Sequence, residues 1–266
     1  EMNTGRKQLG GSGESSTAAL AFGGGVPGTP GVANTETWDG SSWAEVNDLN
    51  TARANMGCFG TATAAISAAG TDSTTDAVEQ WNGSSWTEIA ELNTERARTG
   101  GAGTTTDGLI ITGGPPNVAN TEAWNGSAWT EVNDVATARH EAGSGGTGSA
   151  SWIAGGYSTT TVNSTEEWTF SGLDPSTTPA ADYADAITGD FYYNSTTGQF
   201  KTVNTGGAPI GTWASGGALN SARRILAGAG TQTAGLAFGG YNTDYRGLTE
   251  EYNGSSWSED GDLNTA

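Results

Sequence analysis

Two charged residue types recur at fixed places along the chain and are the first candidates for chemistry. An arginine stands near the start of each of five similar segments, and a glutamate stands two residues before an aromatic residue later in the same segment. The ten residues are Arg6, Arg53, Arg96, Arg139 and Arg223, with Glu36, Glu79, Glu122, Glu166 and Glu250. They could form a ring of charges around a ligand-binding pore. They could also pair inside the fold, because a partly buried guanidinium needs a carboxylate partner. Repetition in every segment favours structural pairing, since a binding site usually breaks such symmetry.

Residues suited to acid–base, nucleophilic or metal chemistry are few. The chain has one histidine, His140, and one cysteine, Cys58, and it contains no G-x-S-x-G, phosphate-loop or H-E-x-x-H motif. Asp182 and Asp185 could form the acid pair of a glycosidase, but their place in the connector-like segment YADA favours solvated aspartates. We therefore expect a non-enzymatic protein with no catalytic site, no metal and no cofactor.

The charge balance disfavours two classes of partner. The chain carries 10 Lys and Arg against 29 Asp and Glu, for a formal net charge of −19. Nucleic-acid binding needs clustered cations, so a phosphate backbone is not expected as a partner. An anionic membrane surface is disfavoured for the same reason, and no apolar run reaches the roughly 18 residues of a membrane-spanning helix.

Internal repetition organises the positions of these residues. The repeats cover residues 2–48, 49–91, 92–134, 135–218 and 219–262, and the two most regular are each 43 residues long. The fourth is interrupted by an insertion at residues 169–210, in which TGDFYYNSTTGQFKTV has the pattern of a β-hairpin. Each repeat reads as four strands: a small-residue segment, an apolar run ending in Gly-Gly, a T-E-x-W segment and an S-W-T-E segment. An Asn-Gly turn joins the last two strands, which is a strong hairpin signal.

These repeats resemble the kelch repeat over about 225 of the 266 residues. The resemblance rests on the Gly-Gly that closes the second strand, on an aromatic in the third strand and on a tryptophan in the fourth strand. The fourth-strand tryptophans are Trp43, Trp86, Trp129, Trp213 and Trp257. Ala69-Gly70 is a departure from Gly-Gly in the second repeat.

The resemblance implies an all-β, kelch-like β-propeller that forms a single domain over residues 1–266. We expect five four-stranded blades, with the hairpin inserted in the fourth blade and the fourth-strand tryptophans filling the gaps between blades. The final Leu-Asn-Thr-Ala is expected near Met2, where the ring would close. Six blades remain the alternative, with the sixth supplied by the insertion or by residues outside this sequence.

The loops after the second strand differ from copy to copy, as binding loops do. Their least turn-like residues are Tyr157, Tyr241, Tyr245 and Arg246, which we predict as ligand-binding candidates.

The composition of the turns and several short segments suggest a function. The Thr/Ser/Gly/Asn-rich turns, the N-G-S-S-W segments and the GDFYYNSTTGQF hairpin resemble kelch-like virion and tail-fibre proteins of bacteriophages, especially marine ones. This implies an exposed protein, on a virion or extracellular, that binds a host surface glycan or a neighbouring subunit within a homo-oligomer or larger assembly. The alternatives are a glycan-active enzyme whose catalytic groups come from the insertion or a partner chain, and a kelch interaction adaptor.

A metal analysis of the purified protein tests the expected lack of a metal centre. With one Cys and one His, the chain cannot supply the usual ligand sets of zinc or copper. We expect neither metal in stoichiometric amount, and one equivalent of either would contradict this reading.

Overall fold

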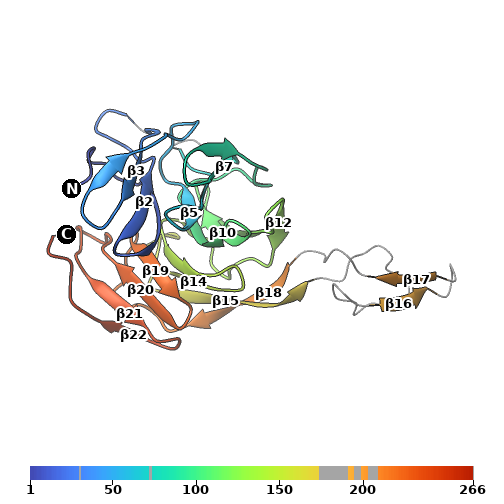
Figure 1. The fold of residues 1–266 in the computed structure, drawn as a ribbon. Helices are drawn as coiled ribbons and strands as arrows, with labels where there is room; N and C mark the ends of the chain where they lie inside the picture. Colours follow the sequence, from blue (N-terminus) through green and yellow to red (C-terminus); the bar gives the residue numbers. More distant parts are fainter. Residues whose placement is uncertain (30, 72–73, 174–190, 195–198, 203–208, 266) are drawn as a thin grey trace.

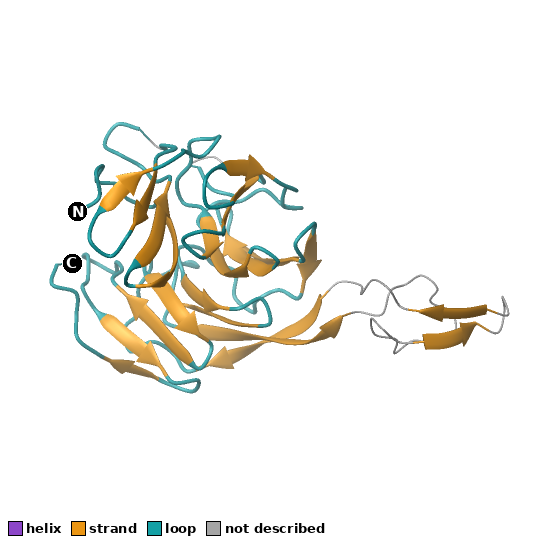
Figure 2. Cartoon of the chain, in the orientation of Figure 1, coloured by secondary structure: helices purple, strands orange, loops and turns teal. Residues whose placement is uncertain are grey.

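The computed structural model describes the chain except for residues 30, 72–73, 174–190, 195–198, 203–208 and 266. Its described residues form β-strands and loops without a helix, and the strands build small sheets arranged around a centre (Figures 1 and 2). Five of these sheets have four antiparallel strands each, and in each the strands follow one another in chain order. The fold class predicted from the repeats, a β-propeller of five four-stranded blades, is confirmed.

The strands of the first three blades are short and have the bounds that follow. Blade 1 contains β1 (Gly10–Ser15), β2 (Ala18–Phe22), β3 (Thr35–Trp38) and β4 (Trp43–Glu45). Blade 2 contains β5 (Gly57–Gly60), β6 (Ala65–Ala68), β7 (Val78–Trp81) and β8 (Trp86–Glu88). Blade 3 contains β9 (Gly100–Thr104), β10 (Asp107–Gly113), β11 (Val118–Trp124) and β12 (Trp129–Val132).

The last two blades differ because the fourth contains the insertion. Blade 4 contains β13 (Gly143–Gly146), β14 (Ala150–Ala154), β15 (Thr165–Leu173) and β18 (Pro209–Gly216). Blade 5 contains β19 (Ala227–Thr231), β20 (Ala234–Phe238), β21 (Thr249–Tyr252) and β22 (Trp257–Glu259). Between β15 and β18, the predicted hairpin is present as β16 (Phe191–Asn194) and β17 (Gln199–Thr202). This pair is a separate two-stranded sheet and does not add a sixth blade. Asp182 and Asp185 lie outside the described residues.

The turn between the third and fourth strands shows why the repeated sequence folds as it does. In blade 2, the side-chain oxygen of Asn82 accepts hydrogen bonds from the backbone N–H groups of Ser84 and Ser85, both at 2.9 Å. Gly83 adopts a φ of 93°, which a side chain would disfavour. The turn places Trp81 opposite Trp86, and their ring centroids lie 5.5 Å apart. The Asn-Gly pair therefore sets the register that brings two large aromatic side chains together.

Tryptophans of the fourth strand also join neighbouring blades. Trp86 of blade 2 meets Phe22 of blade 1 edge to face, with centroids 4.8 Å apart, and its indole N–H donates to Thr35 Oγ1 at 3.1 Å. In blade 5, the N–H of Trp257 donates to Thr165 Oγ1 of blade 4 at 2.9 Å. Each such ring buries much of its large apolar surface between two sheets, which compensates for the scarcity of aliphatic residues.

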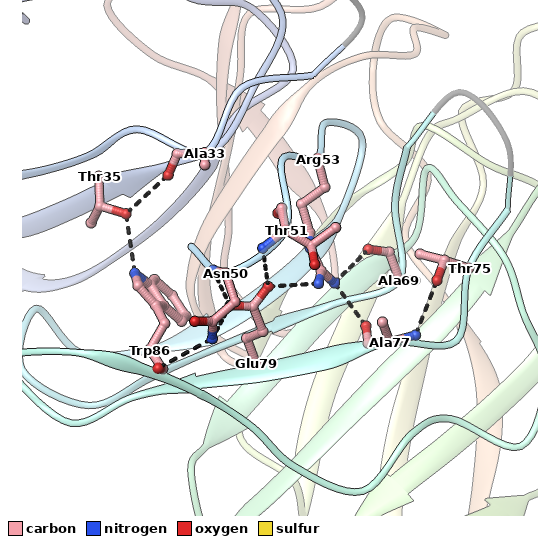
Figure 3. Close-up of polar contacts among 10 residues, drawn as sticks. All are labelled: Ala33, Thr35, Asn50, Thr51, Arg53, Ala69, Thr75, Ala77, Glu79 and Trp86. Atoms are coloured by element: carbon pink, nitrogen blue, oxygen red, sulfur yellow. Dashed lines mark hydrogen bonds and ion pairs between the residues drawn. The ribbon is translucent and has the colours of Figure 1, made fainter. Parts of the chain in front are cut away.

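A buried ion pair holds the beginning of each blade to its third strand. In blade 2, Arg53 Nη2 lies 2.7 Å from Glu79 Oε1 of β7, and Nη1 donates to the carbonyl of Ala77 at 2.8 Å (Figure 3). The other carboxylate oxygen of Glu79 accepts from the backbone N–H of Asn50 at 2.7 Å. We call the segment before each first strand, such as residues 49–55, the lead-in of that blade. The pair fastens the lead-in to β7 and to the loop before it.

The same pair recurs in all five blades. Within each repeat the arginine binds the glutamate of its own blade, with distances of 2.9 Å in the first, 2.9 Å in the third and 3.1 Å in the fourth. The pair of the fifth blade is Arg223–Glu250. All ten side chains are at most 5% exposed. They therefore act inside the blades, and none of them lines the central cavity in the described part of the chain.

Removing one of these arginines should destabilise the protein strongly. Arg96→Ala leaves the carboxylate of Glu122 buried without its cation, which we expect to cost about 3–5 kcal/mol of unfolding free energy. Denaturant-induced unfolding measures the loss. Arg246→Ala is the matched control, because its pair with Asp244 at 2.7 Å is exposed and should contribute roughly 0–1 kcal/mol. Equal losses in the two variants would contradict the structural role.

Candidate functional site

The centre of the ring is hollow but offers little chemistry. A cavity of about 1030 Å³ is lined mainly by glycine, alanine and serine residues of the innermost strands β1, β5, β9, β13 and β19. Its cysteine, Cys58, donates its S–H to the carbonyl of Gly11 at 3.2 Å, and burial raises the pKa of the thiol. The thiolate, which is the reactive form, is therefore disfavoured.

In each blade, the residue just before one of the cavity's lining residues has unusual backbone geometry. The second residue after each repeated arginine has a positive φ between 55° and 58°; these residues are Gln8, Asn55, Arg98, Glu141 and Ile225. We call these five residues the rim. In chain order, the N–H of every rim residue from Asn55 onward donates to the carbonyl of the rim residue before it. Left-handed backbone is costly for residues other than glycine. Its recurrence in all five blades, together with the hydrogen bonds between rim residues, gives it a structural role in joining neighbouring blades.

Next to the rim, blades 4 and 5 bring two tyrosines against one arginine, and a third tyrosine packs against one of the two. The guanidinium carbon of Arg224 lies 4.8 Å from the ring centroid of Tyr157 and 5.4 Å from that of Tyr241. Tyr241 in turn meets Tyr245 edge to face, with centroids 5.3 Å apart, and Tyr245 is 68% exposed. We call these four residues the tyrosine–arginine cluster. Guanidinium–ring contacts of this kind are attractive and orient both partners.

The repeat architecture explains how the cluster is positioned. Tyr157 and Tyr241 each directly follow the Gly-Gly that ends the second strand of their blade. Each pairs through its backbone with the residue after the repeated arginine, which is His140 in blade 4 and Arg224 in blade 5. Equivalent positions of two adjacent blades thus present their side chains on the same face.

Glu141 of the rim orients the arginine of the cluster. Glu141 Oε2 lies 3.2 Å from Arg224 Nη1, and Glu141 Oε1 lies 3.6 Å from Arg98 Nη1 of the preceding blade. The two ion pairs fix the position of the Glu141 carboxylate between the two guanidinium groups. The arrangement places one exposed ring, that of Tyr245, near two half-buried tyrosines and charged hydrogen-bonding groups, which suits binding.

His140 is fixed in one tautomer beneath the cluster. The amide nitrogen of Asn117 donates to the carbonyls of Tyr157 and Ser158, at 3.3 and 2.7 Å. Its amide oxygen therefore faces His140 and accepts from Nδ1–H at 2.6 Å. Burial lowers the pKa of this histidine, an effect that Glu141 opposes and that Arg98 and Arg224 reinforce. The neutral imidazole acts as a spacer under Tyr157, whose ring centroid is 5.5 Å away.

Three of the four residues proposed from the sequence lie together. Tyr157, Tyr241 and Tyr245 belong to the cluster, whereas Arg246 points to its own ion pair with Asp244. Sequence reasoning did not single out Arg224 or Glu141. A usable signal was present, because the residue after the repeated arginine varies between copies: Lys7, Ala54, Ala97, His140 and Arg224.

Other kinds of site find no support in the described residues. No group of three His, Cys, Asp or Glu side chains among them could hold a metal ion. Within the same part of the chain, no helix is long and apolar enough to cross a membrane. Comparison with models of known protein families finds no matching family. Comparison with curated protein sequences finds no matching protein.

The histidine makes the stability of the protein sensitive to mild acid. Its pKa is lower in the folded state than the roughly 6.5 of an unfolded chain, so the unfolded state binds the proton more tightly. The stability it contributes is complete above pH 6.5 and is lost as the pH falls below that value. We expect the unfolding free energy to fall between pH 7 and about 5.5. Because His140 is the chain's one histidine, His140→Gln should flatten this interval. An unchanged slope in the variant would disprove the assignment.

Proposed function

We propose that this chain is a non-enzymatic binding propeller that holds a carbohydrate on its tyrosine–arginine cluster. The observation that carries the proposal is the contact of Arg224 with Tyr157 and Tyr241, together with the exposed Tyr245 that packs against Tyr241. A sugar ring has one apolar C–H face that can stack on tyrosine and a rim of hydroxyl groups. Tyrosine suits such a ligand because it combines a large apolar ring with a polar end.

The repeat residues support a kelch-type protein as the carrier of this site. The Gly-Gly pairs place Tyr157 and Tyr241, and the buried arginines place Arg224 directly beside them. Variation of the surrounding loops on a constant framework is typical of binding surfaces.

The cellular setting belongs to the same proposal. The low-complexity turns support a protein exposed on a virion, as in a phage tail fibre, or otherwise extracellular. There the cluster would bind a host surface glycan, with neighbouring virion or surface subunits as protein partners in a homo-oligomer or larger assembly. The charge of −19 keeps such an exposed surface soluble.

A panel of immobilised and soluble glycans tests the proposal. We expect the protein to be retained on at least one glycan without release of shortened products. Tyr245→Ala and Arg224→Ala should each weaken that binding about tenfold or more, through loss of one stacking or cation–π contact. Phe170→Ala is the control, because Phe170 is exposed on β15 outside the cluster.

Three outcomes separate the rival functions. Product release would favour a glycan-active enzyme. Retention that survives both cluster substitutions would place the glycan elsewhere on the protein. Binding of a protein partner with no glycan retention would favour an interaction adaptor.

A further inference from the structure

Four of the contacts between adjacent blades share two backbone hydrogen bonds. In the first, a glycine just after the second strand or at its end donates to the carbonyl of the next blade's repeated arginine, as Gly24 does to Arg53 at 2.8 Å; the other donors are Gly70, Gly113 and Gly156. In the second, rim residues are linked, as Arg98 N–H is to the carbonyl of Asn55 at 2.6 Å. The innermost strands also pack side by side in these four places, namely β1 with β5, β5 with β9, β9 with β13, and β13 with β19.

The fifth place, between blades 5 and 1, lacks this joint. Among the described residues, neither Gly240 with Arg6 nor Gln8 with Ile225 forms the corresponding bond. The innermost strands β19 and β1 do not pack side by side as the other four pairs of innermost strands do. Of the five residues of β19, Gly228 is half-buried and the other four are exposed, whereas β13 has two buried residues and two half-buried ones. We call this opening the seam; it differs from the closed ring predicted from the sequence.

Glycines of the innermost strands show the same opening locally. A Cβ atom on Gly101 would come within 2.6 Å of the carbonyl oxygen of Cys58 in the preceding blade, and one on Gly228 within 2.5 Å of that of Ser144. At the equivalent Gly11 of blade 1, a Cβ would meet only Leu20 O of its own blade, at 3.8 Å. The space that a preceding blade fills elsewhere is free at Gly11.

On the blade 5 side of the seam, a further lead-in is already in place. Leu263 donates its N–H to Gly247 O at 2.8 Å, as Leu49 does to Ala33 O at 3.0 Å. Asp262 accepts from Thr249 N–H at 3.2 Å, as Asp48 does from Thr35 at 3.1 Å. The side chain of Leu263 nevertheless remains 46% exposed, whereas Leu49 is 4% exposed between blades 1 and 2.

Blade 1 has its own lead-in on the other side of the seam. The N–H of Asn3 donates to Glu36 Oε2 at 2.7 Å, in the manner of Asn50 and Glu79. The seam thus holds two lead-ins, whereas every closed joint holds one. The indole of Trp43 is half-buried and lines the central cavity. The hydroxyl of Thr249, equivalent to the acceptors of Trp86 and Trp257, is buried without a hydrogen-bond partner, as is that of Thr121 at a closed joint, so this feature alone does not mark the seam.

We propose that the seam is the docking site of one further four-stranded blade of this same repeat type. Leu263 would be the first residue of the lead-in of that blade. Such a blade supplies each missing element: an arginine carbonyl for Gly240, a rim residue between Ile225 and Gln8, and a tryptophan facing Thr249. It would also cover Leu263 and the exposed residues of β19. This inference is independent of the carbohydrate proposal, since the tyrosine–arginine cluster is formed by blades 4 and 5 alone.

Adding a repeat to the chain tests the proposal. A copy of residues 92–134 is joined directly after Asp262, so that its leucine replaces Leu263. We expect one cooperative thermal transition, at a higher temperature than in the five-repeat chain, because repeat proteins gain stability from each nearest-neighbour interface. Gly11→Val then reports on the seam. In the five-repeat chain it should shift the midpoint by less than about 2 °C, and in the six-repeat chain it should lower it by about 5 °C or more.

Gly101→Val is the matched control and should destabilise both chains, because its joint is closed in each. Three results would overturn the proposal. The first is that Gly11→Val is as damaging as Gly101→Val in the five-repeat chain, which would mean that five blades close the ring directly. The second is that the added repeat melts separately, with Gly11→Val harmless in both chains. The third is that the five-repeat chain forms a dimer that the added repeat does not abolish, in which case a second copy occupies the seam.

Discussion

The whole architecture depends on a guanidinium group that is buried at the start of every blade. An arginine without access to water is tolerated only when a carboxylate and further acceptors surround it. Arg53 meets this requirement through Glu79 and two carbonyls of its own blade. Once the side chain is held, the backbone of the same residue is held too. Its carbonyl then accepts the N–H of Gly24 from the preceding blade. One residue thus fastens the inside of a blade and the joint to its neighbour, which explains how a chain so poor in aliphatic residues forms an ordered ring.

The tyrosine–arginine cluster is placed by the same residue. In blades 4 and 5 the position after the arginine pairs through its backbone with Tyr157 or Tyr241, and the next position takes the left-handed conformation of the rim. In blades 2 and 3 the first of these positions is alanine, whereas in blades 4 and 5 it is His140 and Arg224. The framework is therefore nearly symmetric, whereas the residue type at this position is not. Binding specificity can arise at two adjacent blades without disturbing the pairs beneath them.

The sequence predicted those features that depend on local chemistry repeated along the chain. Asn82-Gly83 forms its turn with its own neighbours, and Trp81 meets Trp86 because that turn sets their register, so both could be anticipated from one repeat. The contact of Arg224 with Tyr157 could not. It joins residues of different blades, and it requires the rim geometry and the charge of Glu141, which no local pattern reveals. Tyr241 and Tyr245 were found because their loop differs from its counterparts, but the arginine that organises them was hidden by its place next to a structural one.

At the open seam, the packing that suits a terminal repeat differs from the packing that closes a ring. In a repeat protein each unit is stabilised mainly by its two neighbours, so the terminal units expose one interface each. A ring removes this cost only if its two terminal faces meet with the same geometry as the internal ones. Here the faces of blades 5 and 1 cannot meet in that way while both lead-ins lie between them, since every other joint has room for one. The exposed side chain of Leu263 and the empty space beside Gly11 are two consequences of that single crowding. An additional blade removes this crowding, because the lead-in that begins at Leu263 becomes part of that blade. Direct contact between blades 5 and 1 instead requires one of the two lead-ins to move out of the seam.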